Sequence, residues 1–396
     1  MVTRCKIIYC EGPGDLVASY AAWKRGHDFT KETSVTFSGQ FFEFCRLKSL
    51  SFYAISYGSV AQTIVEGTCT VSNLPRREIR LPKIGYELTV FLYAARLLLI
   101  ALQVRPQVIF VASGVTDWIY LAILRLSGAR IVPILHNTLW PEGFPPRQGL
   151  RQKAYRFIWQ RCVWWTLAVS PACARQVQSI AGPVPITIFK PSFPAASFTE
   201  AKPKQFEDTS FRVMFAGRIE ENKGVFDILD IAEQLPHVEF LLCGDGNALP
   251  ELRRQVDARR LTNVSTYGQL ERVQLLDRYL QAHVVIVPTK STFAEGFAMV
   301  VAEAILLLRP VISNPVVPAT EVLQSAVVLV PTDNVSGYVA AIEDLSKSGS
   351  SYHRLVEQAA ALRAFILDDS TSFLESLKII GKRMVDIDLI PAHHEA

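Results

Sequence analysis

Several common functional signatures are absent from the sequence, and each absence narrows the function. The 396-residue chain contains no Walker A motif, HExxH pair or Ser-His-Asp pattern, and its first turn lacks the GxGxxG sequence expected of a dinucleotide oxidoreductase. Its seven cysteines form no CxxC pair, so we expect reduced core thiols in a cytoplasmic protein. The N-terminus has no apolar signal-peptide segment. A net charge of +4 does not by itself argue for a nucleic-acid partner.

One long apolar run, Leu88–Val104, could be mistaken for a membrane span. A spanning helix needs about 20 apolar residues and rarely carries a central arginine. The polar residues of the run, Thr89, Arg96 and Gln103, recur every seven positions and would form one stripe on a helix. We therefore expect a buried helix with one wetter edge, with a membrane span as the alternative.

Short apolar runs alternate with helical stretches along the chain, which is typical of βαβ units and parallel sheets. The predicted strands are CKIIYC, SFYAISY, QVIFVAS, RIVPILH and TLAVS, then FRVMFAG, VEFLLCG, NVSTYG, VVIVPT, PVISN and AVVLV. The sequence thus predicts an α/β fold of two doubly wound, Rossmann-like domains facing across a cleft. The predicted boundaries are residues 1–190, a linker at 191–210, residues 211–370, and a final helix at 371–396 that crosses back to the first domain.

Charged residues and glycines follow the predicted strands of the second half. FAGRIEENKG places Arg218 and Lys223 after the first strand, and CGDGN, YGQL and EGFAMVVAE follow later ones. Arginine grips phosphate oxygens through a planar fork, and lysine acts as a mobile point charge. A helix beginning near Ala298 would leave unpaired amides that suit an anion, with Glu295 before it and Glu303 inside it. Each piece alone fits a tight turn or a solvated charge, but together they suit a ligand that is part phosphate and part sugar.

Taken in order, Gly-Arg-x4-Lys-Gly, Gly-Asp-Gly, Tyr-Gly, Pro288 and Glu-x7-Glu resemble the C-terminal domain of retaining GT-B glycosyltransferases, in particular glycosyltransferase family 4. The resemblance runs from about Phe211 to Glu321 and is looser over the N-terminal half. It implies transfer of a sugar from a nucleotide-diphosphate sugar to an acceptor hydroxyl with retention of configuration. The implied acceptor is a glycan, a lipid-linked sugar or a small molecule, as in polysaccharide biosynthesis.

The same resemblance implies roles for individual residues. Arg218 and Lys223 match the pair that holds the donor diphosphate. Glu295 matches the acid that contacts the donor sugar, and Glu303 the acid that accepts from the ribose hydroxyls. The other donor-side positions are Gly217, Gly244, Gln269, Leu270, Gly296, Phe297 and Ala298, with Gln269 and Leu270 near the base. The chain departs from the family at Ala298, where glycine is commoner, and in NPVVPATE, which replaces a glycine-rich turn before Glu321.

Three features of the first half are candidate site residues, and two of them also allow a purely structural interpretation. The CEGPGD turn lies where the family carries a glycine-rich loop near the donor phosphates, which assigns Gly12 and Gly14 to donor binding. In LHNTLWPEGF, His136 follows a strand; the resemblance places it near the donor sugar among the catalytic residues, and the alternative is a structural histidine. FSGQFF, residues 37–42, either lines an acceptor pocket or is a loop with two buried phenylalanines.

Residues 147–165 are basic and aromatic, with Arg147, Arg151, Lys153, Arg156 and Arg161 alongside Trp159, Trp164 and Trp165. Such a helix could lie on an anionic membrane, cations toward the head groups and aromatics at the interface, or could be a core helix with a solvated basic face. A membrane contact would place the protein on the cytoplasmic face and would suit a lipid-linked acceptor.

No metal or cofactor beyond the nucleotide-sugar co-substrate is expected. The only Asp-x-Asp pair, Asp386 and Asp388, lies in the C-terminal tail, whereas metal-dependent transferases of the other main fold hold a cation with such a pair. Arg218, Lys223 and helix amides can supply the positive charge instead. A GT-B sugar-nucleotide epimerase and a non-catalytic scaffold with this fold are the alternative functions.

Overall fold

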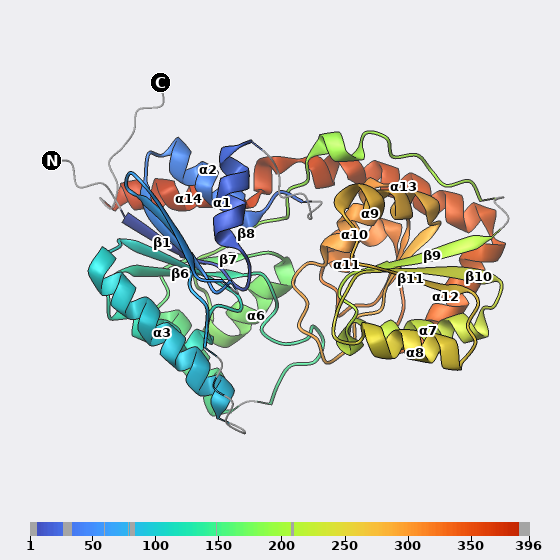
Figure 1. Cartoon of the computed structure of the whole chain (residues 1–396), viewed down its shortest axis with the longest axis horizontal. Coiled ribbons are helices and arrows are strands. Elements are labelled where there is room, and N and C mark those ends of the chain that lie inside the picture. The colour runs from blue at the N-terminus through green and yellow to red at the C-terminus, as the bar shows by residue number, and fades with distance from the viewer. Residues whose placement is uncertain are drawn as a thin grey trace.

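Two sheets, one in each half of the chain, organise the computed structural model (Figure 1). It describes residues 6–26, 34–58, 60–77, 79, 84–147, 149–206 and 210–387. Each strand predicted from an apolar run is present, because a parallel strand covered on both faces must be apolar along its whole length. The predicted α/β fold with two doubly wound sheets is confirmed.

The first sheet has eight strands in the order β3-β4-β2-β1-β5-β6-β7-β8, all parallel except β3, which is antiparallel to β4. Their bounds are β1 Lys6–Cys10, β2 Ser51–Ser56, β3 Gln62–Glu66, β4 Cys69–Asn73, β5 Val108–Ala112, β6 Arg130–Leu135, β7 Thr166–Ala168 and β8 Ile186–Ile188. The sequence analysis missed β8 and the β3–β4 hairpin. Most of β3 is exposed, so it lacks the apolar run that marks a covered strand.

Helices cover both faces of the first sheet. The helices of this half are α1 Leu16–Lys24, α2 Phe37–Leu47, α3 Gly85–Val104, η1 Trp118–Tyr120, α4 Leu121–Arg125, α5 Leu150–Arg161 and α6 Pro171–Ala181. The C-terminal helix α14, Phe373–Asp386, packs against α2 and shares the core around Tyr9 and Phe110 with α1 and α2. On the opposite face, α3, α4 and the Ile158 side of α5 pack on Ile8 and Ile109. Figure 1 shows α3 across the sheet from α1, α2 and α14.

The FSGQFF segment belongs to helix α2, so its interpretation as a loop is wrong. Thr36 caps the helix by accepting a hydrogen bond from the Gly39 amide at 3.0 Å. Gln40 is buried, and its side-chain oxygen accepts from the amide of Leu374 at the start of α14 at 3.0 Å. The polar residues between the aromatics therefore connect two helices within the core.

Helix α3 is only partly buried, which contradicts the expected buried helix with a polar edge. Thr89 is buried, because its hydroxyl accepts a hydrogen bond from the Ile79 amide at 2.9 Å. Arg96 and Gln103 are exposed as expected, but most of the other exposed side chains of α3 are apolar. Within the described part of the chain, α3 is the one helix long and apolar enough to cross a membrane, and 33% of that stretch is buried.

The second sheet has six parallel strands in the order β11-β10-β9-β12-β13-β14. Its strands are β9 Phe211–Ala216, β10 Val238–Cys243, β11 Val264–Gly268, β12 Val284–Val287, β13 Val311–Ser313 and β14 Val327–Leu329. Its helices are α7 Val225–Gln234, α8 Leu249–Ala258, α9 Arg272–Gln281, α10 Met299–Leu306, α11 Ala319–Val322, α12 Val335–Lys347 and α13 Gly349–Leu367. Short 3₁₀ turns are η2 Ala195–Phe198, η3 Glu221–Lys223, η4 Gln324–Ala326 and η5 Asp369–Thr371. The strand order reverses between β9 and β12, and open α/β sheets bind ligands at such a point.

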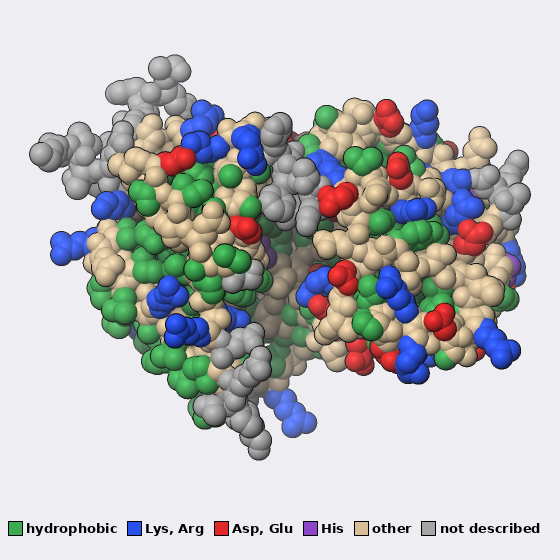
Figure 2. Space-filling model, viewed as in Figure 1, with side chains coloured by type: hydrophobic (Ala, Val, Ile, Leu, Met, Phe, Trp, Pro, Cys, Tyr) green, Lys and Arg blue, Asp and Glu red, His purple; other side chains and the backbone are tan. Residues whose placement is uncertain are grey.

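The two halves meet at a hollow that the space-filling view shows between them (Figure 2). One contact across it is a hydrogen bond from the Thr138 amide, after β6, to the Glu295 carbonyl, after β12, at 3.1 Å. Another is backbone packing: a Cβ on Gly296 would lie 1.7 Å from the His136 carbonyl oxygen. The loops that follow β6 and β12 are therefore held against each other.

Candidate active site

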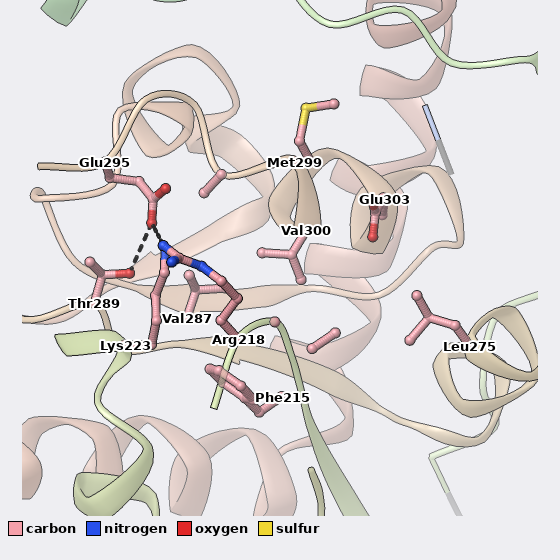
Figure 3. A pocket seen from close by; sticks show the side chains of 13 residues that line it. Phe215, Arg218, Lys223, Leu275, Val287, Thr289, Glu295, Met299, Val300 and Glu303 are labelled. Carbon is pink, nitrogen blue, oxygen red and sulfur yellow. Dashed lines mark hydrogen bonds and ion pairs between the residues drawn. The ribbon is translucent and has the colours of Figure 1, made fainter. Parts of the chain in front are cut away.

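A cavity of about 310 Å³ lies where the loops after β9 and β12 meet the start of α10 (Figure 3). Its lining includes six of the residues proposed from the sequence, namely Gly217, Arg218, Lys223, Glu295, Ala298 and Glu303. These residues lie far apart in the sequence, and the topological switch point of the second sheet brings them together.

The loop after β9 carries two cations to the cavity. Gly224 has φ +75°, and a Cβ there would lie 2.1 Å from the Pro288 carbonyl oxygen, so glycine lets this loop pack on the β12 loop. Arg218 is exposed over 58% of its side chain, whereas Lys223 is exposed over only 16%. Both cations lie over the ring of Phe293, at 5.6 and 4.1 Å from its centroid. The sequence analysis missed Phe293, because contact between these loops depends on the fold.

A buried carboxylate faces the lysine. Lys223 Nζ lies 2.5 Å from Glu295 Oε2, and the same oxygen accepts a hydrogen bond from the Thr289 hydroxyl at 3.4 Å. Figure 3 shows Lys223 and Thr289 both pointing at this carboxylate. Thr289 also lines the cavity and was not proposed from the sequence. Glu295 is 8% exposed, so the pair is largely shielded from water and fixes the direction of the lysine side chain.

Helix α10 begins where the sequence predicted, with Ala298 as its N-cap. Ala298 has φ +64°, the left-handed region that costs a residue with a Cβ roughly 1–2 kcal/mol. This explains why glycine suits the position. The amides of residues 296–300 have no hydrogen-bond acceptor among the described residues. Because Ala298, Met299 and Val300 line the cavity, these donors form a positive patch beside the two cations.

Glu303 lies one turn inside α10 and reaches the far end of the cavity. It is 8% exposed, and its Oε2 accepts a hydrogen bond from the buried Tyr279 hydroxyl at 2.7 Å. Burial, followed by the nearby Glu303 charge, raises the pKa of Tyr279 well above its ordinary value, so the phenol stays a donor. Tyr279 positions this carboxylate and was not proposed from the sequence.

Gly244 and Gly296 are in contact with main chain. A Cβ on Gly244 would lie 1.7 Å from the Gly217 carbonyl oxygen, so Gly244 permits close approach of the β9 and β10 loops. Gly296 faces the first half in the same way. Neither residue lines the cavity among the described residues, and the same is true of exposed Gln269, partly buried Leu270 and buried Phe297.

The glycine turn after β1 has its neighbouring amides already satisfied. The Asp15 side chain accepts from the Ala18 amide at 2.9 Å, and Asn73 Oδ1 accepts from Leu16 at 3.0 Å. Gly12 lies against the loop after β5, where a Cβ would be 3.1 Å from the Ser113 carbonyl oxygen. A Cβ on Gly14 would have no neighbouring heavy atom within 4 Å among the described residues. The described structure therefore gives these glycines no contact with the cavity, and their role in donor binding stays a prediction.

His136 lies at the boundary of the two halves. Its ring stacks on Phe37 with 4.5 Å between centroids, and both ring nitrogens are buried without a hydrogen-bond partner among the described residues. Burial lowers the pKa of His136 to about 4. The imidazole is therefore neutral at pH 7 and suits a hydrogen bond to a neutral hydroxyl better than acid–base work.

Glu321 lies apart from Glu295 and Glu303, the two carboxylates that line the cavity. It is paired with Arg175 of α6 through two contacts of 2.7 and 2.8 Å, and Arg175 also lies 3.2 Å from Glu142. This pair bridges the two halves near the surface. Glu321 does not line the cavity among the described residues.

The helix predicted within residues 147–165 is α5, which exposes Phe157 but buries Trp159. Trp159 is buried in the core, and the Trp165 indole donates to a threonine hydroxyl on β8. Arg151 pairs with Asp117, and Arg156 donates to a carbonyl of α6. Trp159 is therefore a core residue, whereas Trp164 and Trp165 are partly buried, and a membrane contact through residues 147–165 stays a prediction.

No group of three or more potential metal ligands is found among the described residues. Asp386 ends α14, whereas Asp388 lies outside the described residues. Five cysteines within the described part of the chain are free thiols, namely Cys10, Cys69, Cys162, Cys173 and Cys243.

The sequence is similar to a known protein family and to a known transferase. Residues 197–362 match the family model described as Glycosyl transferases group 1. Alpha-D-kanosaminyltransferase of Streptomyces kanamyceticus is 25% identical over 159 residues, which cover 38% of this chain and 40% of that protein. The alignment thus spans less than half the length of this relative.

Solved structures match nearly the whole fold at low identity. Sucrose-phosphate synthase of Thermosynechococcus elongatus superposes with a TM-score of 0.72 and 15% identity, covering 97% of this chain and 100% of that one. HepE of Anabaena, solved in complex with UDP, gives a TM-score of 0.63 and 16% identity, covering 96% of this chain and 100% of that one. The fold is therefore that of GT-B glycosyltransferases. Residues 197–362 are similar to the family Glycosyl transferases group 1, in line with the resemblance seen in the sequence.

Proposed function

We propose that this protein transfers a sugar from a nucleoside-diphosphate sugar to an acceptor hydroxyl, with retention of configuration and without a metal ion. The observation that carries the proposal is the convergence of Arg218, Lys223 and unpaired helix amides on one cavity that also holds two buried carboxylates. Cations and amides suit a diphosphate, and carboxylates suit hydroxyl groups. A ligand that carries a diphosphate between two groups with hydroxyls fits this arrangement.

The charges of the cavity account for the proposed chemistry. When the bond from the anomeric carbon to the phosphate oxygen breaks, its electron pair remains on the departing diphosphate. Arg218, Lys223 and the α10 amides then stabilise that negative charge. The acceptor oxygen bonds to the same face of the sugar and gives its proton to the departing phosphate, so no protein base is required.

The Lys223–Glu295 ion pair gives a specific order of events. In this structure the carboxylate holds the lysine at 2.5 Å. A diphosphate competes for the same ammonium group, and Glu295 can then accept from a hydroxyl of the donor sugar. Glu303, held by Tyr279, accepts from the ribose in the same model. Neutral His136 contributes a hydrogen bond to the sugar, as the resemblance implies.

UDP is the first nucleotide to test, because HepE, which shares the fold, has been solved with UDP and with UDP-glucose. The acceptor we propose is a carbohydrate or lipid-linked hydroxyl. We place the reaction in the cytoplasm. Cys10, Cys69, Cys162, Cys173 and Cys243 are free thiols, as expected of a reducing compartment.

The test compares Arg218→Ala and Lys223→Ala with the parent enzyme, using nucleotide release from several donors. Each variant should lose roughly 100-fold or more in turnover with an unchanged melting temperature. Arg254→Ala is the matched control, because Arg254 is an exposed arginine in a local pair with Glu251 and lies away from the cavity. Near-normal turnover in either site variant would contradict the proposal.

Product analysis separates the remaining alternatives. Proton NMR of the product should show the anomeric configuration of the donor retained. An epimerised nucleotide sugar formed without acceptor would instead indicate an epimerase. Nucleotide binding without any turnover across a panel of acceptors would favour a non-catalytic scaffold.

A further inference from the structure

The outer face of α3 and α4 carries apolar side chains that no described residue covers. They are exposed over 36% to 73% of their surface and comprise Leu88, Phe91, Leu92, Leu99, Leu102 and Leu126. Figure 2 shows hydrophobic side chains gathered over the part of the first half where Figure 1 places α3. Single exposed apolar residues are ordinary, whereas a contiguous patch marks an interaction surface.

The spacing of these residues makes the patch a stripe along one helix. Leu88, Phe91, Leu92, Leu99 and Leu102 lie at positions i, i+3, i+4, i+11 and i+14, which share one side of a helix, and the exposed Arg96 lies between Leu92 and Leu99. The opposite side of α3 is also apolar, and its residues Tyr93, Leu97 and Ala101 pack into the core against the first sheet. Because the fold uses that side, α3 cannot leave the sheet to cross a bilayer and can only lie flat on a surface.

Cations border the stripe and converge at one end of it. Arg105, Arg125 and Arg130 line a cavity of about 650 Å³ together with Leu102, the last leucine of the stripe. Arg96 is exposed midway along α3. The segment from 85 to 165 contains nine lysines and arginines but only three acids, and one of the three, Asp117, is paired with Arg151. The cations that the structure places at the stripe are Arg96 along α3 and Arg105, Arg125 and Arg130 at its end.

We propose that the α3–α4 face rests on an anionic lipid bilayer. The leucines and Phe91 enter the boundary between head groups and acyl chains, and the arginine-lined cavity takes lipid phosphate groups. Exposed cations of α5, such as Lys153 and Arg161, add electrostatic attraction from the same layer of helices. The inference rests on this surface and not on the transfer chemistry, so each can fail without the other.

Charge complementarity favours a bilayer over a second copy of the chain. A twofold pair centred on α3 would bring Arg96, near the middle of the helix, toward its own symmetry mate. It would also bring together two surfaces rich in cations, and like charges disfavour such contact. Anionic head groups match the cations, and acyl chains match the leucines.

The test is co-sedimentation of the full chain with vesicles of phosphatidylcholine alone or mixed with phosphatidylglycerol, at low and high salt. We expect binding to the anionic vesicles that weakens as salt rises. Leu92→Ser/Leu99→Ser should weaken it at least about tenfold, because both side chains lie on the exposed stripe. Arg105→Ala/Arg125→Ala should reduce both the affinity and its dependence on salt.

Matched controls lie on the other half of the molecule. Val273→Ser removes an exposed apolar side chain of α9, and Arg254→Ala removes an exposed arginine of α8; neither should alter vesicle binding. Melting temperatures of all variants check that the fold is kept.

Three outcomes would overturn the proposal. Parent protein that stays in the supernatant with anionic vesicles at low salt excludes the membrane. A dimer seen by light scattering that dissociates in Leu92→Ser/Leu99→Ser assigns the face to a second copy. Stabilisation by inorganic phosphate that is lost in Arg105→Ala/Arg125→Ala, without vesicle binding, assigns the cavity to a soluble anion.

Discussion

The two halves of the molecule share a sheet plan but treat their strand ends differently. In the second half, the loops after β9 and β12 leave two cations and a row of unpaired amides at a cavity. In the first half, Asp15 and Asn73 already satisfy the amides at the start of α1, and His136 is stacked beneath Phe37. A site for a charged ligand forms where the fold leaves donors unsatisfied, so we expect the second half to hold the donor.

The largest expected effect comes from breaking the contact between the halves at Gly296. In Gly296→Ala the new Cβ would lie 1.7 Å from the His136 carbonyl oxygen, so one loop has to move. Because small displacements of a reacting group can cost about 100-fold, we expect turnover to fall by at least that factor. Nucleotide affinity, which depends on the second half, should change much less.

Gly149→Ala is the control for this experiment. Gly149 precedes α5, and a Cβ there would meet only ordinary contacts of 3.6 Å or more. Its kinetics should match the parent. Normal turnover in Gly296→Ala would show that the observed approach of the halves is not required for transfer.

A second change acts within the donor half alone. Tyr279→Phe removes the hydroxyl that donates to Glu303 at 2.7 Å. A hydrogen bond to a charged group contributes roughly 1.5–3 kcal/mol, so nucleoside-diphosphate affinity should fall about tenfold or more. Calorimetric titration measures the affinity.

Tyr352→Phe is the matched control for Tyr279→Phe. The Tyr352 hydroxyl donates to the Lys204 carbonyl away from the cavity. This variant should lose some stability with unchanged nucleotide affinity. Equal affinities in the two variants would remove Glu303 from the ribose site.

A third change concerns pH and the first half. Burial lowers the pKa of His136 to about 4 from its usual 6.5. Between these values the unfolded chain binds a proton that the folded chain refuses, so stability falls as pH drops from 6.5 toward 4. His136→Phe keeps a ring against Phe37 and removes this proton, and its melting temperature should fall less between pH 7 and pH 5.

His283 in the second half provides the comparison for the pH experiment. Burial lowers its pKa to about 4 as well, so His283→Phe should flatten the same curve. An unchanged pH dependence in His136→Phe would mean that the buried, neutral state assigned to His136 is wrong.

The smallest expected effect lies at the surface bridge between the halves. Arg175 is 48% exposed, and exposed ion pairs contribute roughly 0–1 kcal/mol. Arg175→Ala should therefore change turnover less than about threefold, and less still at high salt. A loss as large as that in Gly296→Ala would mean that this bridge, and not backbone packing at Gly296, keeps the two halves together.

The sequence predicted much of the second half because its signals are local. Apolar runs predicted the covered strands, and the α10 start at Ala298 and the order of Arg218, Lys223 and Glu295 could be read without a fold. Tyr279, Thr289 and Phe293 could not be found this way, because their contacts depend on how separate loops and helices meet.

In α3 and α5, periodicity and composition did not predict which side chains are buried. The spacing in α3 placed Thr89, Arg96 and Gln103 on one side of the helix. It did not show that Thr89 is buried, where its hydroxyl accepts a hydrogen bond from the Ile79 amide. Composition likewise did not show that Trp159 of α5 is a core residue, because it cannot tell a core aromatic from an interfacial one.

The central claim is that the second half holds a nucleoside diphosphate through Lys223, the α10 amides and Glu303. The most direct measurement is calorimetric titration of UDP, GDP, ADP, CMP and NAD into the parent, Lys223→Ala and Glu303→Ala proteins, each with and without EDTA. The account predicts that one nucleoside diphosphate binds the parent, that EDTA has no effect, and that both variants bind it at least about tenfold more weakly. Binding of NAD alone, or of no nucleotide at all, would contradict it.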